Sequence, residues 1–128
     1  MKNGYSVRVA ESSKALTARE KIMYSDTSNA TKLDDLVTLE SPMVITPAEY
    51  AVLSVHNERS ENVDYEVFVI IDANNNKYVT GSQSFWNSFS DIWATMHEEE
   101  INEQYDIEIY KKESKNYKGK YFLTCSIV

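Results

Sequence analysis

Glycine and histidine are scarce in this sequence, and each scarcity removes a class of site. The three glycines, Gly4, Gly81 and Gly119, lie too far apart to form a loop that cradles phosphate. Neither His56 nor His97 has a second ligand at metal spacing, because His97 opens an HEEE run instead of the H-E-x-x-H arrangement. We therefore predict that the chain has no metal site and no cofactor.

The single cysteine and the absence of a long hydrophobic run limit where the protein works. Cys125 has no partner for an internal disulfide and lies in an apolar alternation, so we expect a buried thiol and not a nucleophile. No apolar run approaches the ~20 residues that cross a bilayer. Residues 1–10 lack the basic-then-apolar pattern of a signal peptide. The sequence therefore predicts a cytoplasmic protein with no membrane partner. Because the G-x-S-x-G motif is also absent, it predicts a protein that is not an enzyme.

Basic residues are in the minority, 13 against 20 acidic residues, which gives a formal net charge of −7. This charge weighs against general nucleic-acid affinity, because nonspecific binding depends largely on neutralising phosphates. The charges are unevenly placed, however. Five of the 13 basic residues lie within positions 111–120, directly after an acidic block at 98–106. A local field matters more to a docking strand than the total charge does.

Residues 106–128 predict a β-hairpin with a basic loop. Ile107 and Ile109 alternate before the loop, and Leu123, Cys125 and Ile127 alternate after it, which is the period-two pattern of paired strands. Lysines and tyrosines are interleaved between the two runs: Tyr110, Lys111, Lys112, Lys115, Tyr117, Lys118, Lys120 and Tyr121. Cations that follow a phosphate backbone, beside rings that stack on bases, are what sequence-tolerant single-strand binding requires. The alternative is a solvated hairpin whose lysines prevent edge-to-edge pairing.

The preceding chain predicts three strands and one long helix. Residues 50–55, 65–71 and 77–80 are rich in strand-forming types, and the DANNN turn at 72–76 separates the last two. The helix begins near Ser84, and its apolar stripe recurs at i, i+4, i+7 and i+11. The stripe consists of Phe85, Phe89, Ile92 and Met96, flanked by Trp86 and Trp93.

This order of elements predicts a mainly β protein with the OB-fold, a five-stranded Greek-key barrel with one helix between strands 3 and 4. The domain would cover residues 41–128. The apolar residues of positions 1–40 follow neither the helical nor the strand period cleanly, and we interpret this segment as an N-terminal extension packed on the domain. The basic connection between the last two strands would then be the loop that closes over an oligonucleotide.

Several aromatic residues have two interpretations. Trp86 and Trp93 share the apolar stripe of the helix, which favours packing under the barrel over base stacking. Phe68 is out of phase with the alternating set at Tyr65, Val67 and Val69, so we expect an outward ring that either stacks on a base or packs across strands. Tyr110 is likewise out of phase with its neighbours Ile107 and Ile109.

Two motifs carry a resemblance to a known family. They are YVTGSQSFW at 78–86 and KNYKGKYFLTCSIV at 115–128. From about residue 47 to its end, the chain resembles the small single-stranded DNA-binding proteins of phages and plasmids of Gram-positive bacteria. The resemblance implies an OB-fold that coats single strands during replication or transfer of the element. It also implies loop contacts by Lys115, Asn116, Tyr117, Lys118 and Lys120.

The leading hypothesis is a non-enzymatic protein that binds single-stranded DNA of a mobile element. Phosphates would be followed by Lys111, Lys112, Lys115, Lys118 and Lys120, and bases would stack on Phe68, Tyr110 and Tyr117. A homo-oligomer and contacts with replication or recombination proteins are compatible with this function. The chain ends in a predicted strand at 126–128, where housekeeping bacterial single-strand binders carry an acidic tail, so partner recruitment by that route is not expected.

The alternative hypothesis belongs to another class. An acidic, phage-encoded interaction protein could inhibit a host nucleic-acid enzyme by occupying its basic groove with the charge of −7. The acidic residues at 98–103 would then be the active surface.

Overall fold

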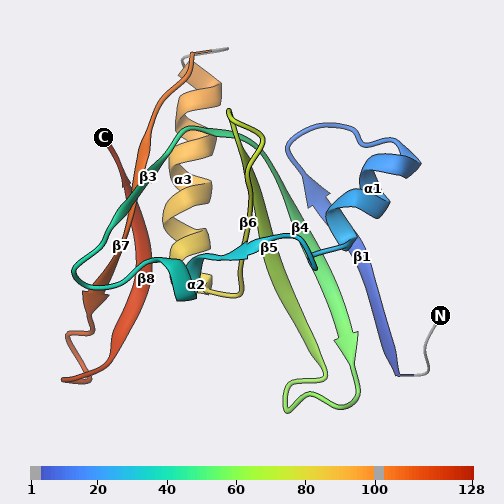
Figure 1. Ribbon diagram of the computed structural model, residues 1–128, viewed down its shortest axis with the longest axis horizontal. Helices are drawn as coiled ribbons and strands as arrows, with labels where there is room; N and C mark the ends of the chain where they lie inside the picture. The colour runs from blue at the N-terminus through green and yellow to red at the C-terminus, as the bar shows by residue number, and fades with distance from the viewer. Residues whose placement is uncertain (1–3, 100–102) are drawn as a thin grey trace.

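The computed structural model describes residues 4–99 and 103–128. The strands in these ranges are β1 (Tyr5–Ser12), β2 (Thr31–Lys32), β3 (Met43–Ile45), β4 (Pro47–Asn57), β5 (Asp64–Asp72), β6 (Lys77–Thr80), β7 (Ile107–Glu113) and β8 (Tyr121–Ile127). The helices are α1 (Ala18–Ser25), α2 (Leu33–Leu36) and α3 (Gln83–Glu99). Figure 1 shows two sheets with α3 at their junction.

The large sheet has five strands in the order β1-β4-β5-β6-β2. Its centre is the antiparallel meander of β4, β5 and β6. The turn between β5 and β6 is organised by Asp72, whose buried carboxylate accepts hydrogen bonds from the backbone N–H groups of Asn74 (3.0 Å) and Asn76 (2.8 Å). Asn75 adopts a positive φ of 68°, which asparagine tolerates better than most residues. The predicted turn at 72–76 is therefore confirmed.

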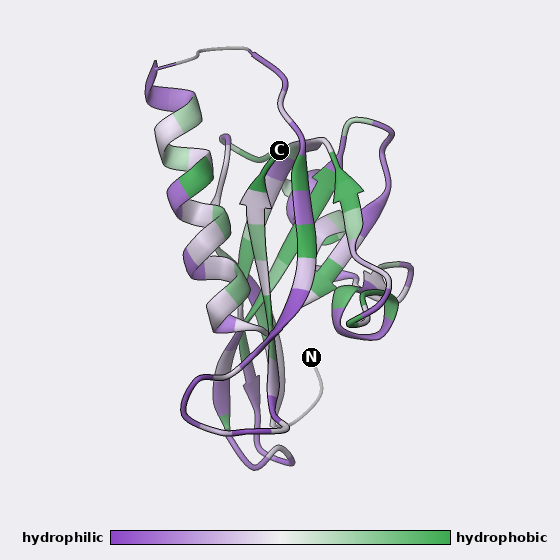
Figure 2. Cartoon of the chain, turned by 90° about the vertical axis from the view of Figure 1, so that its left-hand side faces the viewer, coloured by the Kyte–Doolittle hydropathy of each residue, from purple (hydrophilic) through white to green (hydrophobic). Residues whose placement is uncertain are grey.

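The small sheet has three strands in the order β3-β7-β8. The helix α3 lies along β8, where the Ser84 hydroxyl donates to the Leu123 carbonyl (2.8 Å) and the Ser88 and Thr124 hydroxyls are 2.9 Å apart. Because the helix covers this side of β8, the strand does not present a fully open edge. In Figure 2, α3 stands beside the strands of the hairpin.

The main core lies between one face of the large sheet, the small sheet and α3. Its buried members include Ile45, Ile70, Tyr78, Phe85, Phe89, Ile107, Ile109, Leu123 and Cys125. Trp86 and Trp93 are half-buried against this cluster, so they pack on the core as predicted, although they lie against two open sheets and not under a barrel. Trp86 lies flat on Phe68, with ring centroids 4.7 Å apart, and Trp93 meets Tyr50 edge-on at 5.1 Å.

A second core lies on the opposite face of the large sheet, under α1. Tyr24 of α1 is fully buried there, and its hydroxyl donates to the Glu49 carboxylate at 2.5 Å. The Lys77 ammonium of β6 donates to the carbonyls of Met23 (2.5 Å) and Asp26 (2.6 Å), which holds the end of α1 against the sheet. Both faces of the central strands are therefore covered.

The prediction of a mainly β chain with a helix between the third and fourth of its predicted strands agrees with the order β4, β5, β6, α3, β7, β8. A closed five-stranded barrel is not found in the described residues, which form two open sheets instead. The barrel does not close because the hairpin pairs with β3 and not with a strand of the large sheet. β7 pairs with β3, with Met43 opposite Ile109 and Ile45 opposite Ile107, so the hairpin joins a separate sheet.

The division of the chain at residue 40 stays a prediction. In the structure, β1 and β2 come from that first segment and form the two edges of the large sheet. None of the helices in residues 4–99 and 103–128 has the length and apolarity needed to cross a bilayer.

Candidate nucleic-acid interface

On β7 the burial alternates as predicted, with Ile107 and Ile109 buried, whereas β8 is buried at three consecutive residues, Leu123, Thr124 and Cys125. Ile109 is paired with Cys125 on the buried face. Burial raises the pKa of the Cys125 thiol to about 12, so this cysteine is not a nucleophile at neutral pH. The outward face carries two cross-strand rows, Tyr110 opposite Thr124 and Lys112 opposite Phe122. Thr124 is itself buried, because its hydroxyl contacts Ser88 of α3.

Two aromatic side chains lie on this outward face. Tyr110 is half-buried, and its hydroxyl is 2.8 Å from that of Ser126. Phe122 is also half-buried and occupies the diagonal position relative to Tyr110, within reach of an aromatic neighbour. Phe122 was not among the predicted site residues, although its phase opposite to Leu123 and Cys125 was the signal that could have found it.

The tip of the hairpin, residues 114–120, is a structured turn. The Ser114 N–H donates to the Lys120 carbonyl (2.8 Å), and the Lys120 N–H donates to the Tyr117 carbonyl (3.1 Å). Gly119 has a φ of +83°, the value that the third position of a type II turn requires and that glycine adopts without strain. The Glu113 carboxylate accepts the Gly119 N–H at 3.2 Å. The turn thus holds the Tyr117 backbone in a defined place.

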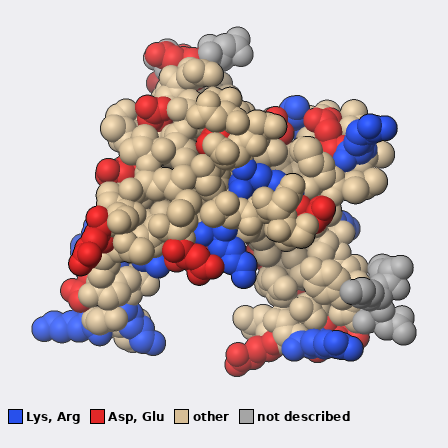
Figure 3. Space-filling model, viewed as in Figure 1, with Lys and Arg blue, Asp and Glu red and all other residues tan. Residues whose placement is uncertain are grey.

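The side chains of the tip point into solvent. Tyr117 is 66% exposed, and Tyr121, the first residue of β8, is 47% exposed. The outward lysines and the loop amide are all exposed: Lys112, Lys115, Asn116, Lys118 and Lys120. None of these four lysines forms a salt bridge with a residue that the structure describes. In Figure 3 their charge is gathered at the lower left end of the molecule. We name this set, with Tyr110, Tyr117, Tyr121 and Phe122, the hairpin surface.

Two of the predicted site residues are not part of the hairpin surface. Phe68 is 1% exposed, so the prediction of an outward ring is wrong. Both faces of β5 are covered, and Phe68 faces α3, where Trp86 stacks on it. Lys111 is in phase with the buried residues of β7, and its ammonium donates to the Asp34 carbonyl at 2.9 Å. This bond links β7 to α2, so the position of Lys111 suits packing at the edge of the core better than contact with a phosphate.

The acidic block lies at the other end of α3 from the hairpin tip. Glu98 and Glu99 are exposed at the end of the helix, and Glu103 is exposed before β7. Glu100 lies outside the described residues. Figure 3 shows acidic residues at the top of the molecule and the lysines of the tip at the bottom. The two charge clusters that are adjacent in sequence are thus separated in space.

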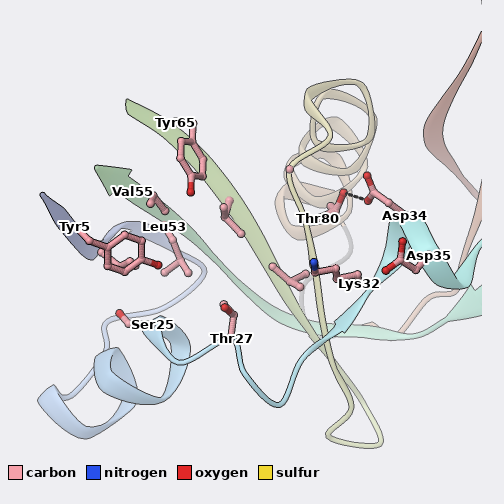
Figure 4. A pocket seen from close by; sticks show the side chains of 14 residues that line it. Tyr5, Ser25, Thr27, Lys32, Asp34, Asp35, Leu53, Val55, Tyr65 and Thr80 are labelled. Carbon is pink, nitrogen blue, oxygen red and sulfur yellow. Dashed lines mark hydrogen bonds between the residues drawn. The ribbon is translucent and has the colours of Figure 1, made fainter. Parts of the chain in front are cut away.

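A cavity of about 520 Å³ opens on the α1 side of the large sheet. Figure 4 shows Tyr5, Val55 and Tyr65 at one end and Asp34 at the other, bonded to Thr80. The Thr80 hydroxyl donates to Asp34 at 2.5 Å and accepts the Ser82 N–H at 3.1 Å. These hydrogen bonds tie α2 to β6.

The described residues contain no group of three or more histidine, cysteine or acidic side chains that could hold a metal ion. That the chain is not an enzyme stays a prediction. No family model, no curated protein and no solved structure matches the chain significantly. Membership of the single-stranded DNA-binding proteins of phages and plasmids therefore stays a prediction as well.

Proposed function

We propose that the protein binds single-stranded DNA through the hairpin surface, and that it coats and protects single strands during replication or transfer of a mobile element. One observation carries this proposal. Tyr117, 66% exposed on a hydrogen-bonded turn, lies among exposed lysines that have no carboxylate partner in the described residues. A ring and several free cations on one ordered turn are the two components that sequence-tolerant binding needs.

Each component has a separate task. The ammonium groups neutralise phosphates and release counterions, which gives affinity without base information. Tyr117 at the tip, together with Tyr110 and Phe122 on the strands, offers π-faces to unpaired bases at about 1–3 kcal/mol for each stacked base. Because stacking requires unpaired bases, the surface favours single strands over duplex.

The charge distribution orients a bound strand. Residues 106–128 hold five lysines and three acidic residues, a net charge of +2, so the remaining residues sum to −9 within the total of −7. A polyanion is attracted to the hairpin and repelled by the rest of the surface. The proposal depends on this small-sheet hairpin and does not require a closed barrel.

The test is fluorescence anisotropy with a labelled oligonucleotide, measured over a range of salt concentrations. The variant replaces Lys115, Lys118 and Lys120 by alanine. Each phosphate contact adds about 0.7 log unit to the affinity for a tenfold decrease in salt. Because the variant lacks three contacts, we expect its affinity at about 0.1 M salt to be roughly 100-fold lower. The slope of log K against log salt should become shallower by about 2.

The matched control replaces three exposed basic residues elsewhere, Arg19, Lys32 and Arg59, by alanine. This control has the same net charge as the test variant but an intact hairpin. We expect it to bind nearly like the parent protein. Equal losses in both variants would assign binding to overall charge, and a salt-independent affinity or tighter binding to duplex would remove the proposal.

A second function is favoured by the charge of −9 outside the hairpin and by the exposed Glu98 and Glu99 at the end of α3. This function is that of an acidic interaction protein that occupies the basic groove of a host nucleic-acid enzyme. It predicts that the protein competes with DNA for such an enzyme and does not itself bind oligonucleotides. The variant Glu98→Lys with Glu99→Lys would then abolish competition, whereas the triple lysine variant would leave it intact.

A further inference from the structure

The strand β1 forms an outer edge of the large sheet. It pairs with β4 on one side, and no described residue pairs with its other side. The Glu58 N–H donates to the Gly4 carbonyl at 2.8 Å, so the Gly4 carbonyl points towards β4. Because backbone direction alternates along a strand, the N–H and C=O groups of Tyr5, Val7 and Val9 point outward.

The side chains of the same three residues lie on the face that α1 covers. Val7 and Val9 are half-buried there, and Tyr5 is 44% exposed. A groove runs between β1 and α1, and Val7, Val9 and Ile22 are among the residues that line it. Ile22 is 72% exposed, an unusual state for an isoleucine next to a sheet edge. Figure 1 shows α1 beside β1 at the right side of the molecule, away from α3.

We propose that a second copy of this chain pairs with β1 in antiparallel orientation, with the two-fold axis at Val7. Val7 then faces Val7 of the second copy, and Tyr5 faces Val9 of the second copy. All three outward residues enter hydrogen-bonded pairs, each of which exchanges both N–H···O bonds. The two large sheets become one continuous sheet, and the contact is isologous, as a dimer of identical chains requires.

The side chains are self-complementary in this register. On the α1 face, the Tyr5 ring of one copy lies against Val9 of the other copy. This aromatic–aliphatic contact stabilises paired strands. The ring also enters the groove of that other copy, beside its Ile22. On the opposite face, Ser6 lies across from Arg8 of the second copy. A register centred on Arg8 would place two guanidinium groups directly opposite each other, which is destabilising.

The end of the paired segment is also defined by the structure. The register between β1 and β4 shifts between Val9 and Glu11, so Ala10 forms a bulge. A bulge bends its strand and interrupts regular pairing, which limits the new contact to residues 5–9. The contact is remote from the hairpin surface, so it does not depend on the proposed DNA binding.

The first experiment measures molar mass by light scattering over a range of protein concentrations. We expect the mass to rise towards twice the 14.7 kDa of one chain. The variants Ile22→Lys and Tyr5→Ser should each weaken dimerisation by at least about tenfold, because each removes an apolar contact between Tyr5 of one copy and the groove of the other. The control Leu39→Lys, at a side chain that is 53% exposed and outside β1, should dimerise like the parent.

The second experiment locates the axis by oxidative cross-linking of Val7→Cys. The native Cys125 is 5% exposed and does not compete for the oxidant. Rapid disulfide formation at position 7 supports the register, because the two Cα atoms would lie within disulfide range. The comparison variant is Val44→Cys on the exposed edge strand β3. A monomer at every concentration, dimerisation unchanged by Ile22→Lys, or cross-linking at position 44 but not at position 7 would each overturn the proposal.

Discussion

Among the single residues of the hairpin surface, base stacking and phosphate neutralisation are carried by different side chains. Tyr117 is exposed on the same turn as Lys118 and Lys120, and the backbone hydrogen bond between Lys120 and Tyr117 fixes their spacing. A ring contributes by contact with a base, and an ammonium group contributes by neutralising phosphate. Single substitutions can therefore distinguish the two.

We expect Tyr117→Ala to weaken oligonucleotide binding by roughly 5- to 150-fold, the loss of one stacked base. The slope of log K against log salt should stay nearly unchanged, since a stacking contact releases few counterions. Thermal stability should also stay unchanged, because the ring is 66% exposed. Anisotropy titrations at several salt concentrations measure both quantities. Parent-like affinity would mean that Tyr117 does not stack.

At the scale of elements, the hairpin of β4 and β5 carries a titratable cross-strand pair. His56 and Asp64 are directly opposite each other, with Nδ1 and Oδ1 2.7 Å apart. The hydrogen bond to Asp64 is the main cause that raises the pKa of His56 above its ordinary value of 6.5, and the charge of Glu58 adds to it. The pair favours the protonated imidazole and so links the stability of the hairpin to pH.

The sign of this linkage follows from the raised pKa. The stabilisation is fully present below the pKa of histidine in the unfolded chain, about 6.5, and is lost as pH rises through the higher pKa of the folded protein. We expect Asp64→Asn to lower Tm at acidic pH and to have no effect at alkaline pH. Melting curves over this range, with NMR titration of the His56 ring, provide the measurement. An unshifted His56 titration in the parent protein would contradict the prediction.

At the scale of the whole molecule, α3 connects the two sheets into one cooperative unit. Its aromatic side chains contact the large sheet through Tyr50 and Phe68, while its serines bond to β8 of the small sheet. The same arrangement places the acidic end of α3 and the basic hairpin tip at opposite ends of the molecule, as Figure 3 shows. Stability and charge separation thus depend on one helix.

We expect Trp93→Ala to destabilise the protein by about 3 kcal/mol, the low end for loss of a core tryptophan because Trp93 is half-buried. The substitution removes its contacts with Tyr50 and Phe89, so both sheets should unfold together. Denaturant unfolding followed by circular dichroism measures the change. The control Asp91→Ala, exposed on the same helix, should have little effect. A stable Trp93→Ala protein that no longer binds DNA would instead make this ring part of the interface.

The local elements and the charge pattern could be predicted from the amino-acid sequence. Period-two alternation predicted the β7–β8 strands, the apolar stripe predicted α3, and Asp72 with its asparagines predicted the turn after β5, because each depends on residues near one another in the chain. The outward phase of Tyr110 and the exposure of Lys115, Tyr117 and Lys118 followed from the same local pattern.

How these elements pair and which of their faces are buried depends on long-range packing, which the sequence did not predict. Phe68 was predicted to face outward because one phase of β5 was assigned to the core, but α3 covers one face of the large sheet and α1 the other. Lys111 bonds to Asp34, a residue distant in sequence, and β7 pairs with the short strand β3. Pairing between distant segments depends on how well whole surfaces pack together, and a periodicity read along one segment does not contain that information.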